Sequence, residues 1–214
     1  MATALPPVSS AEEGYLLLAD ISGYSGFMSG LGEAHGVDFS QGIPPGFALM
    51  GALLDAVAAG LTDPFTVVKF EGDAVFATAR PETLDGRGAY AVEQLRGTYQ
   101  RFIEARTRAD IGRGDHWCEA CVLTSSLDLK MVLHEGPYVR QAVQQQSELL
   151  GNSVNVVHRM LKSSVAEAVG NRHFLHLTEA AAARLGLGDA GVAHLETYDI
   201  GEVPGRVLDL TASD

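Results

Sequence analysis

The chain has 214 residues, of which 46% are hydrophobic, and this suits one globular domain with a sizeable core. Its 15 Lys and Arg residues against 27 Asp and Glu residues give a formal net charge of -12, which argues against nucleic acid or an anionic membrane as a partner. No apolar run reaches the roughly 18 residues that are needed to cross a bilayer.

The first segment, "MATALPPVSSAEEG", lacks both the basic start and the long apolar run of a secretion signal. We therefore expect residues 1–13 to be a disordered leader and residues 14–214 to form a single domain. The two cysteines do not make a disulfide framework, which favours a cytoplasmic location.

The first half of the domain shows strand, helix and hairpin patterns in turn. "GYLLLADIS" is a short continuous apolar run that is typical of a buried strand. The Gly-rich segment after it, to about residue 44, has no periodicity. The patterns then predict a helix over 44–61, two strands over 65–79 that turn at Gly72 and Asp73, and an amphipathic helix over 88–109.

The second half begins with an alternating run over 127–136, which predicts a strand paired with the polar run 138–146. A helix, a strand, a helix and a last strand are predicted to follow over 153–165, 173–178, 178–187 and 205–210. The order strand, helix, strand, strand, helix, strand predicts an α+β fold of the ferredoxin-like βαββαβ type, with an antiparallel-rich sheet covered by helices.

Asp20 and Asp73 are the first candidate site residues, because a ferredoxin-like sheet brings the end of the first strand beside the hairpin turn. Two neighbouring carboxylates can share divalent cations, and Mg²⁺ completes its ligands with water and substrate phosphate. The backbone after Asp20 is suited to cradling a phosphate, over Ile21, Ser22, Gly23 and Tyr24. Taken singly, Asp20 also fits a helix N-cap and Asp73 a turn residue.

Asn155 and Arg159 are four residues apart on a predicted helix, on a different face from its apolar stripe, so both side chains can point into one cleft. An arginine there can spread charge over a reacting phosphate while the asparagine orients the nucleophile. The alternative is a solvated polar face.

His116, Cys118 and Cys121 form an H-x-C-x-x-C cluster whose thiolates and imidazole suit Zn²⁺. A closed structural site needs a fourth ligand, for which Asp115 and His134 are candidates. The cysteines are equally consistent with small buried hydrophobic residues in a loop.

Four segments in this order resemble the signature segments of class III nucleotidyl cyclases: "LLLADISGYSGFM", "VKFEGDAVFA", "LHEGPY" and "LLGNSVNVVHRML". The resemblance covers residues 14 to 162, and it is closer to an uncharacterised branch of that superfamily that is known only as a domain of unknown function. That branch similarly has an "EGD" turn, a cysteine cluster and an "HRLLK"-like helix.

The resemblance implies a role for each matching residue. Asp20 and Asp73 match the two metal-binding aspartates, and Lys69 matches the lysine that reads the base in adenylyl cyclases. Asn155 and Arg159 match the residues that orient the ribose and stabilise the transition state.

Glu148 stands where adenylyl cyclases usually place a second, acceptor-only base reader. Lys69 donates and Glu148 accepts, which complements adenine and leaves cytosine open, whereas guanine reverses the order. Glu71 departs from the class, which generally has an uncharged residue there, and it can pair with Lys69 or add to the metal site.

The resemblance further implies attack of the ribose 3′-oxygen on the α-phosphate of ATP, which gives 3′,5′-cyclic AMP and pyrophosphate. It implies two Mg²⁺ or Mn²⁺ ions in each site of a head-to-tail homodimer, with the metal ligands from one chain and the base-reading and catalytic residues from the other. Members of the class also hold the triphosphate with a lysine near the final strands, and Arg206 is the nearest candidate for that role.

Two other functions stay open at this point. Glu71 and Glu148 favour a catalytically silent cyclase-homology module that binds a nucleotide or a partner protein. The cysteine cluster alone favours a zinc-stabilised redox or scaffold protein.

Overall fold

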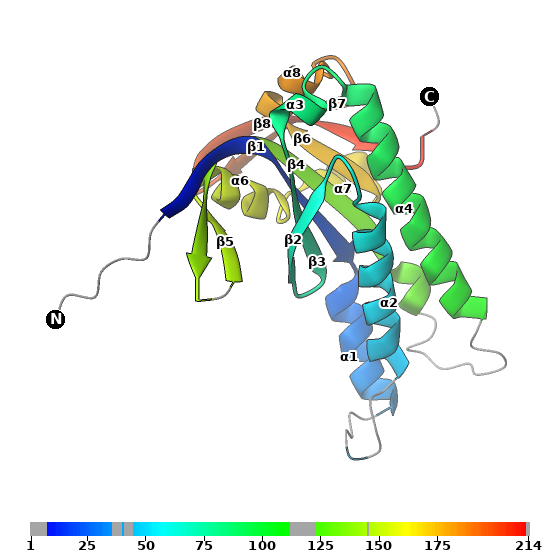
Figure 1. Cartoon of the computed structure of the whole chain (residues 1–214). Coiled ribbons are helices and arrows are strands. Elements are labelled where there is room, and N and C mark those ends of the chain that lie inside the picture. Colours follow the sequence, from blue (N-terminus) through cyan, green and yellow to red (C-terminus); the bar gives the residue numbers. More distant parts are fainter. Residues whose placement is uncertain (1–7, 36–39, 41–44, 112–122, 145, 213–214) are drawn as a thin grey trace.

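A computed structural model describes residues 8–35, 40, 45–111, 123–144 and 146–212 (Figure 1). Its strands are β1 (Val8–Ser22), β2 (Thr66–Glu71), β3 (Ala74–Ala79), β4 (Asp128–Val143), β5 (Gln146–Leu150), β6 (Phe174–Thr178), β7 (Val192–Tyr198) and β8 (Gly201–Asp209). Its α-helices are α1 (Tyr24–His35), α2 (Pro45–Gly60), α3 (Pro81–Leu84), α4 (Gly88–Ile111), α6 (Asn152–Met160), α7 (Val165–Val169) and α8 (Glu179–Leu185), and a 3₁₀ turn, η2, spans Leu123–Ser126.

The strands form one eight-stranded sheet in the order β2-β3-β1-β4-β6-β8-β7, with β5 paired to β4. Only β4 and β6 run parallel among these pairs. The part β4-β1-β3-β2 has the strand order of a ferredoxin-like domain, with its helical connections before β2 and β4. The predicted α+β, antiparallel-rich fold is therefore confirmed.

Strand β1 is buried on both faces from Gly14 to Ala19, which explains its continuous apolar run. Tyr15, Leu17 and the alternate residues after them pack into a core beneath α2 and α4, whereas Leu16 and Leu18 pack with residues of α6. Figure 1 shows the corresponding layers, with α1, α2 and α4 on one side of the curved sheet and α6 beneath the arch of β1. Because Asp20 follows the even-numbered residues, it lies on the α6 face.

Three boundaries differ from the sequence predictions. Strand β1 begins at Val8 and pairs with β4, so part of the segment assigned to a leader belongs to the sheet. The Gly-rich segment contains helix α1, whose glycines hid its pattern. Residues 127–136 and 138–146 are not paired strands: most of both belong to the single long strand β4, and β5 is the partner.

Strand β7 was not predicted at all. It is an edge strand with mostly exposed side chains, so it lacks the apolar alternation by which buried strands are found. No helix in the described part of the chain is both long and apolar enough to span a membrane.

Candidate active site

Asp20 and Asp73 lie side by side, as the sequence predicts. Asp20 is opposite Ala74 in the β1–β3 pairing, and the Ile21 N–H donates to the Asp73 carbonyl oxygen at 3.1 Å. The β2–β3 turn that carries Asp73 depends on Gly72, whose φ of +64° lies in the left-handed region that favours glycine. The tight turn thus holds the second carboxylate against the end of β1.

The two carboxylates line a cleft of about 460 Å³ together with the backbone that follows β1. The predicted phosphate segment is part of this lining, through Ile21, Ser22, Gly23 and Tyr24. The segment predicted to bind phosphate therefore lies beside the two carboxylates, where β1 ends and α1 begins.

Lys130 is a residue of this cleft that sequence reasoning missed. Its Nζ lies 3.2 Å from Asp20 Oδ1 and donates to the Leu161 carbonyl oxygen at 3.0 Å. Lys130 is the residue opposite Asp20 in the β1–β4 register. A lysine inside the otherwise apolar start of β4 was the available signal, because a buried cation needs an anionic partner. Arg172 also lines the cleft and brings a second cation.

The charge balance at Asp20 fits a cation-binding role. Only 16% of its side chain is exposed. Burial raises the pKa of Asp20, Lys130 opposes this shift, and the nearby Asp73 charge raises the pKa further. A divalent cation between the two carboxylates would relieve that repulsion. No group of three or more His, Cys, Asp or Glu side chains suited to a metal occurs in the described residues, so the other ligands would come from backbone, water or substrate, as Mg²⁺ commonly accepts.

The predicted base readers are in direct contact although they are 79 residues apart. Lys69 Nζ donates to Glu148 Oε2 at 2.6 Å, which joins β2 to β5. Glu71 Oε1 lies 2.9 Å from the same nitrogen, so Glu71 pairs with Lys69. The three residues line a cleft of about 570 Å³.

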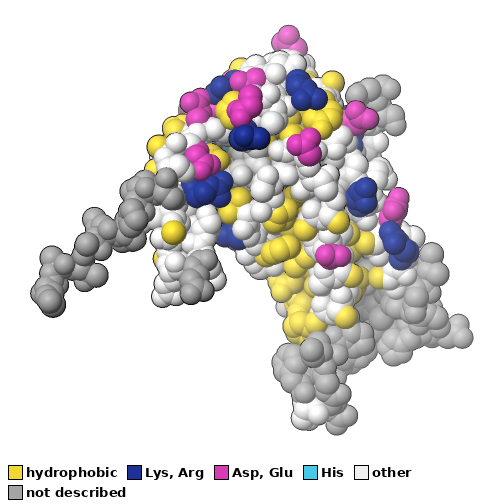
Figure 2. All heavy atoms as spheres, viewed as in Figure 1, with side chains coloured by type: hydrophobic (Ala, Val, Ile, Leu, Met, Phe, Trp, Pro, Cys, Tyr) yellow, Lys and Arg dark blue, Asp and Glu magenta, His cyan; other side chains and the backbone are white. Residues whose placement is uncertain are grey.

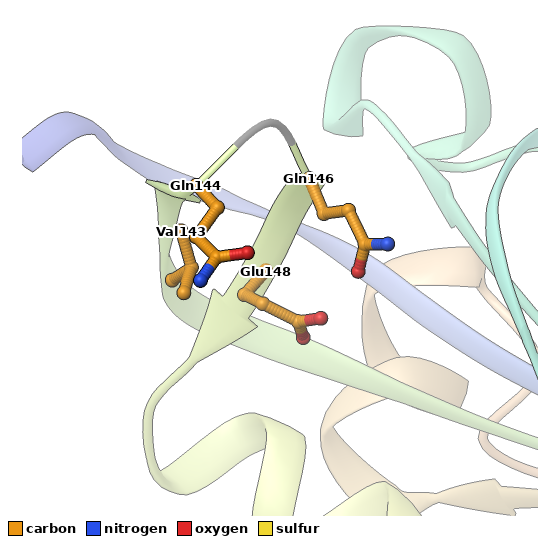
Figure 3. Close-up of a pocket in the computed structure, with 4 residues that line it drawn as sticks. All are labelled: Val143, Gln144, Gln146 and Glu148. Carbon is orange, nitrogen blue, oxygen red and sulfur yellow. The ribbon is translucent and has the colours of Figure 1, made fainter.

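Next to the Lys69–Glu148 cleft is a further hollow of about 980 Å³, at the β4–β5 hairpin. This hairpin projects from the body of the molecule (Figure 1). Figure 3 shows Gln146 and Glu148 extending from β5 to the same side, as expected of residues two apart on a strand. Glu148 lines both hollows, so the hairpin carries one of the two base readers on a protruding arm.

Helix α6 carries the two predicted catalytic residues outside both clefts. Asn155 is exposed, and its side chain has no hydrogen bond to the described residues. Arg159 forms a bidentate ion pair with Asp199, in which Nε donates to Oδ1 at 2.7 Å and Nη2 donates to Oδ2 at 2.8 Å. Neither side chain lines the Asp20–Asp73 cleft of the same chain.

The sequence model of one protein family, described as a protein of unknown function (DUF2652), matches residues 50–169. An uncharacterised protein of Mycobacterium tuberculosis strain H37Rv, Rv2561/Rv2562, is 34% identical over 153 residues, which cover 69% of this chain and 68% of that protein. The chain belongs to the DUF2652 family.

Solved structures similar to this DUF2652 chain include nucleotide cyclases and a cyclase-like protein. A bacterial light-regulated adenylyl cyclase has a TM-score of 0.63 at 16% identity, over 96% of this chain and 53% of that one, so the chain spans about half of it. The adenylyl cyclase CyaB from Pseudomonas aeruginosa has a TM-score of 0.62 at 13% identity, over 94% and 95%. A class III adenylyl cyclase-like ATP-binding protein from Pseudomonas aeruginosa has a TM-score of 0.57 at 16% identity, over 81% and 35%.

The class III cyclase resemblance of the four sequence segments is thus confirmed at the level of the fold. At these identities the likeness extends no further than the fold.

The structure does not bring Arg206 to the Asp20–Asp73 cleft. Paired residues on neighbouring strands point to the same face, and the register across β8, β6, β4 and β1 puts Val207 on the face of Asp20. Arg206, one residue away, points to the opposite face beside Leu177. Within one DUF2652 chain, the described cations that line the cleft are Lys130 and Arg172.

The predicted zinc residues, His116, Cys118 and Cys121, lie outside the described residues. His134, a candidate fourth ligand, is engaged elsewhere: its Nδ1 lies 3.0 Å from the Thr178 hydroxyl oxygen, and burial lowers its pKa to about 4.

Proposed function

We propose that the protein is a class III-like nucleotide cyclase that converts ATP to 3′,5′-cyclic AMP and pyrophosphate. The observation that carries the proposal is the meeting of Asp20 and Asp73 in one cleft with the backbone of the Ser22–Gly26 segment. Carboxylates for cations beside N–H groups for phosphate are what a nucleoside triphosphate requires.

Each group of residues has a distinct part in this proposal. Asp20 and Asp73 would hold Mg²⁺ or Mn²⁺, two ions per site, which when bound lower the pKa of the attacking ribose hydroxyl and neutralise the triphosphate. Lys130 balances the charge of Asp20 from within the cleft. Lys69 donates to the base and Glu148 accepts from it.

Asn155 orients the ribose, and Arg159 stabilises the charge that develops on the reacting phosphate. Arg159 has to leave Asp199 to do so, and its guanidinium is partly exposed, which keeps the cost of exchanging one carboxylate for a phosphate small.

We further propose that the working unit is a homodimer. The Asp20–Asp73 cleft and the Lys69–Glu148 cleft share no lining residue, and the α6 residues line neither. A second copy that faces the first supplies the missing half of each site. The two-fold symmetry of such a dimer gives two identical sites, each with residues from both chains.

The test is a mass-spectrometric assay of purified protein with ATP, CTP, GTP or UTP and Mn²⁺. We expect cyclic AMP from the native protein and at least a 100-fold loss of rate in Asp73→Asn, because that change removes a cation ligand without changing the size of the side chain. Glu82→Gln, on an exposed carboxylate of α3, is the matched control and keeps the native rate. Absence of any cyclic product from confirmed dimer contradicts the cyclase.

A second candidate is a catalytically silent module that binds ATP. The fold similarity to a class III adenylyl cyclase-like ATP-binding protein favours this candidate. So does the ion pairing of Arg159 with Asp199 and of Lys69 with Glu71 in the free chain. A silent module is stabilised by ATP against heating without consuming it, whereas a cyclase is stabilised and also forms product.

A further inference from the structure

Lys69 is held by two carboxylates from different strands. Glu148 Oε2, on β5, lies 2.6 Å from the Lys69 ammonium, and Glu71 Oε1, on the same strand as Lys69, lies 2.9 Å away. The second oxygen of Glu71 lies 3.5 Å from His158 Nδ1, which ties this carboxylate to α6. The three charged side chains are only 26–30% exposed, so water screens them less than surface charges.

This arrangement presents an acceptor, a donor and a second acceptor to a ligand. Lysine can only donate, and an ionised carboxylate can only accept. A base that docks its ring nitrogen on Lys69 meets one carboxylate with its exocyclic amino group. The group on the other side of its ring nitrogen then meets the other carboxylate.

We propose that Glu71 is a specificity-determining residue that makes this site select adenine over cytosine. The inference rests on the proposed function, since it assumes that Lys69 and Glu148 read the base of a nucleotide. It decides between the two bases that the Lys69–Glu148 pair by itself accepts.

The chemistry of the two base edges gives the reason. Adenine and cytosine both present an amino donor next to a ring-nitrogen acceptor, which suits Glu148 and Lys69. On the far side of that nitrogen adenine has a C–H group, whereas cytosine has a carbonyl oxygen. Cytosine therefore sets an acceptor against the Glu71 carboxylate with no proton between them, and such an unpaired contact in a partly desolvated site is costly.

Guanine and uracil are disfavoured by the Glu148 carboxylate. Both place a carbonyl oxygen where adenine and cytosine place the amino group, so that oxygen meets the Glu148 carboxylate. Glu148 thus excludes two bases, and Glu71 excludes the third.

The test measures binding of 3′-deoxy-ATP and 3′-deoxy-CTP with Mn²⁺ by titration calorimetry, because these nucleotides lack the attacking hydroxyl and cannot turn over. We expect native protein to bind the adenine nucleotide about tenfold more tightly. In Glu71→Gln we expect this ratio to fall about tenfold, chiefly through tighter cytosine binding, because the glutamine amide donates to the cytosine carbonyl oxygen while its own oxygen keeps Lys69. Glu71→Leu, which removes the repulsion without adding a donor, gives an intermediate ratio.

Glu82→Gln is the control and leaves the ratio unchanged, because Glu82 lies 3.5 Å from the exposed Arg80 and lines neither cleft. Melting temperatures of all variants show whether they are folded. Binding of both nucleotides with the same ratio in native protein and Glu71→Gln overturns this inference alone. Failure of the native protein to bind either nucleotide overturns the inference and the proposed function together.

Discussion

At the scale of single residues, His176 on β6 is an ionisable side chain held inside the core. Its side chain is fully buried, and neither ring nitrogen has a hydrogen-bond partner within the described part of the chain. Its ring meets that of His194 edge-on, with 5.7 Å between the centroids. Burial lowers the pKa of His176 from 6.5 to about 4, and the His194 charge contributes in the same direction. His176 is therefore neutral in the folded protein at pH 7.

This pKa predicts how stability depends on pH. Below pH 6.5 the unfolded chain binds a proton on His176 that the folded protein does not accept until about pH 4, so the free energy of unfolding falls as the pH decreases through this range. One such group contributes a slope of up to about 1.4 kcal/mol per pH unit. The measurement is urea unfolding at pH 7, 6 and 5 of native protein and His176→Leu.

The leucine variant is expected to lose less stability on acidification, although His134, whose pKa burial also lowers to about 4, keeps part of the slope in both proteins. Equal slopes in the two proteins would show that His176 does not titrate differently in the folded and unfolded states.

At the scale of elements, the β2–β3 hairpin carries residues of both the Asp20–Asp73 cleft and the Lys69–Glu148 cleft. Lys69 and Glu71 are on β2, Asp73 is in the turn, and β3 is buried along its whole length. The turn thus places the Asp73 carboxylate beside β1, whereas Lys69, the proposed base reader, stays on the edge strand β2. Gly72 allows this change of direction because it adopts a positive φ.

Substitution at Gly72 measures what the turn contributes. Gly72→Ala is expected to lower the free energy of unfolding by about 1 kcal/mol, since the left-handed conformation costs a residue with a Cβ about that much. There is space for the methyl group, because no atom lies within 4 Å of it, so the conformation alone is responsible. Chemical denaturation of the variant checks the value, and a weaker affinity for Mn²⁺ reports displacement of Asp73.

Gly97→Ala is the matched control. Gly97 lies within helix α4, is exposed, and also has open space around the added methyl group. Alanine there is expected to raise the free energy of unfolding by about 0.5 to 1 kcal/mol because of its higher helix propensity. Two glycine-to-alanine changes with open space thus have opposite signs, and a stabilising effect at Gly72 would contradict the role given to its positive φ.

At the scale of the whole molecule, charged and apolar side chains are unevenly distributed over the face that Figure 2 shows. Figure 2 shows charged side chains of both signs gathered toward the end where α3 and α8 lie, and hydrophobic side chains gathered toward α1 and α2. The network of Arg184 with Glu13, Asp85 and Glu135 belongs to the first end and links α8 to β1 and β4. The clefts lie elsewhere, so this network stabilises the scaffold without entering the site.

The separation of the site residues into different clefts predicts complementation between inactive chains. Asp73→Asn and Arg159→Ala are each expected to be inactive as pure homodimers. A mixed dimer has one site with both defects and one site with neither. An equal mixture is therefore expected to recover about a quarter of the native rate, since half of the dimers are mixed and one of their two sites is intact.

Cyclic AMP formation after joint refolding of the two variants measures this recovery. The control is a mixture of Asp73→Asn with Asp20→Asn, whose defects are in the same half of the site, and no recovery is expected from it. No recovery in the test mixture would mean that each chain builds its site alone. Recovery in the control mixture would mean that the Asp20 and Asp73 of one site come from different chains.

Local sequence patterns determined much of this protein. The apolar run of β1, the helix α2, the hairpin at Gly72 and the helix α4 follow from periodicity and turn chemistry, which act over a few neighbouring residues. The order of these elements was enough to predict the ferredoxin-like core. The ferredoxin-like order also indicated that Asp20 would approach Asp73, and both residues line one cleft. The resemblance to cyclases assigned Lys69 and Glu148 as the two base readers, and the structure joins these two side chains by a hydrogen bond.

Only the tertiary structure decided the features that depend on distant contacts. Lys130 became a site residue because the β1–β4 register sets it opposite Asp20, and register is invisible in a single strand's pattern. The same alternation turned Arg206 to the other face of the sheet. Glu71 could serve either the metal or the base until its distance to Lys69 was known. Edge strand β7 escaped prediction because pairing with β8, rather than an apolar alternation, holds it. The Gly-rich helix α1 escaped prediction because packing against the core, rather than local propensity, stabilises it.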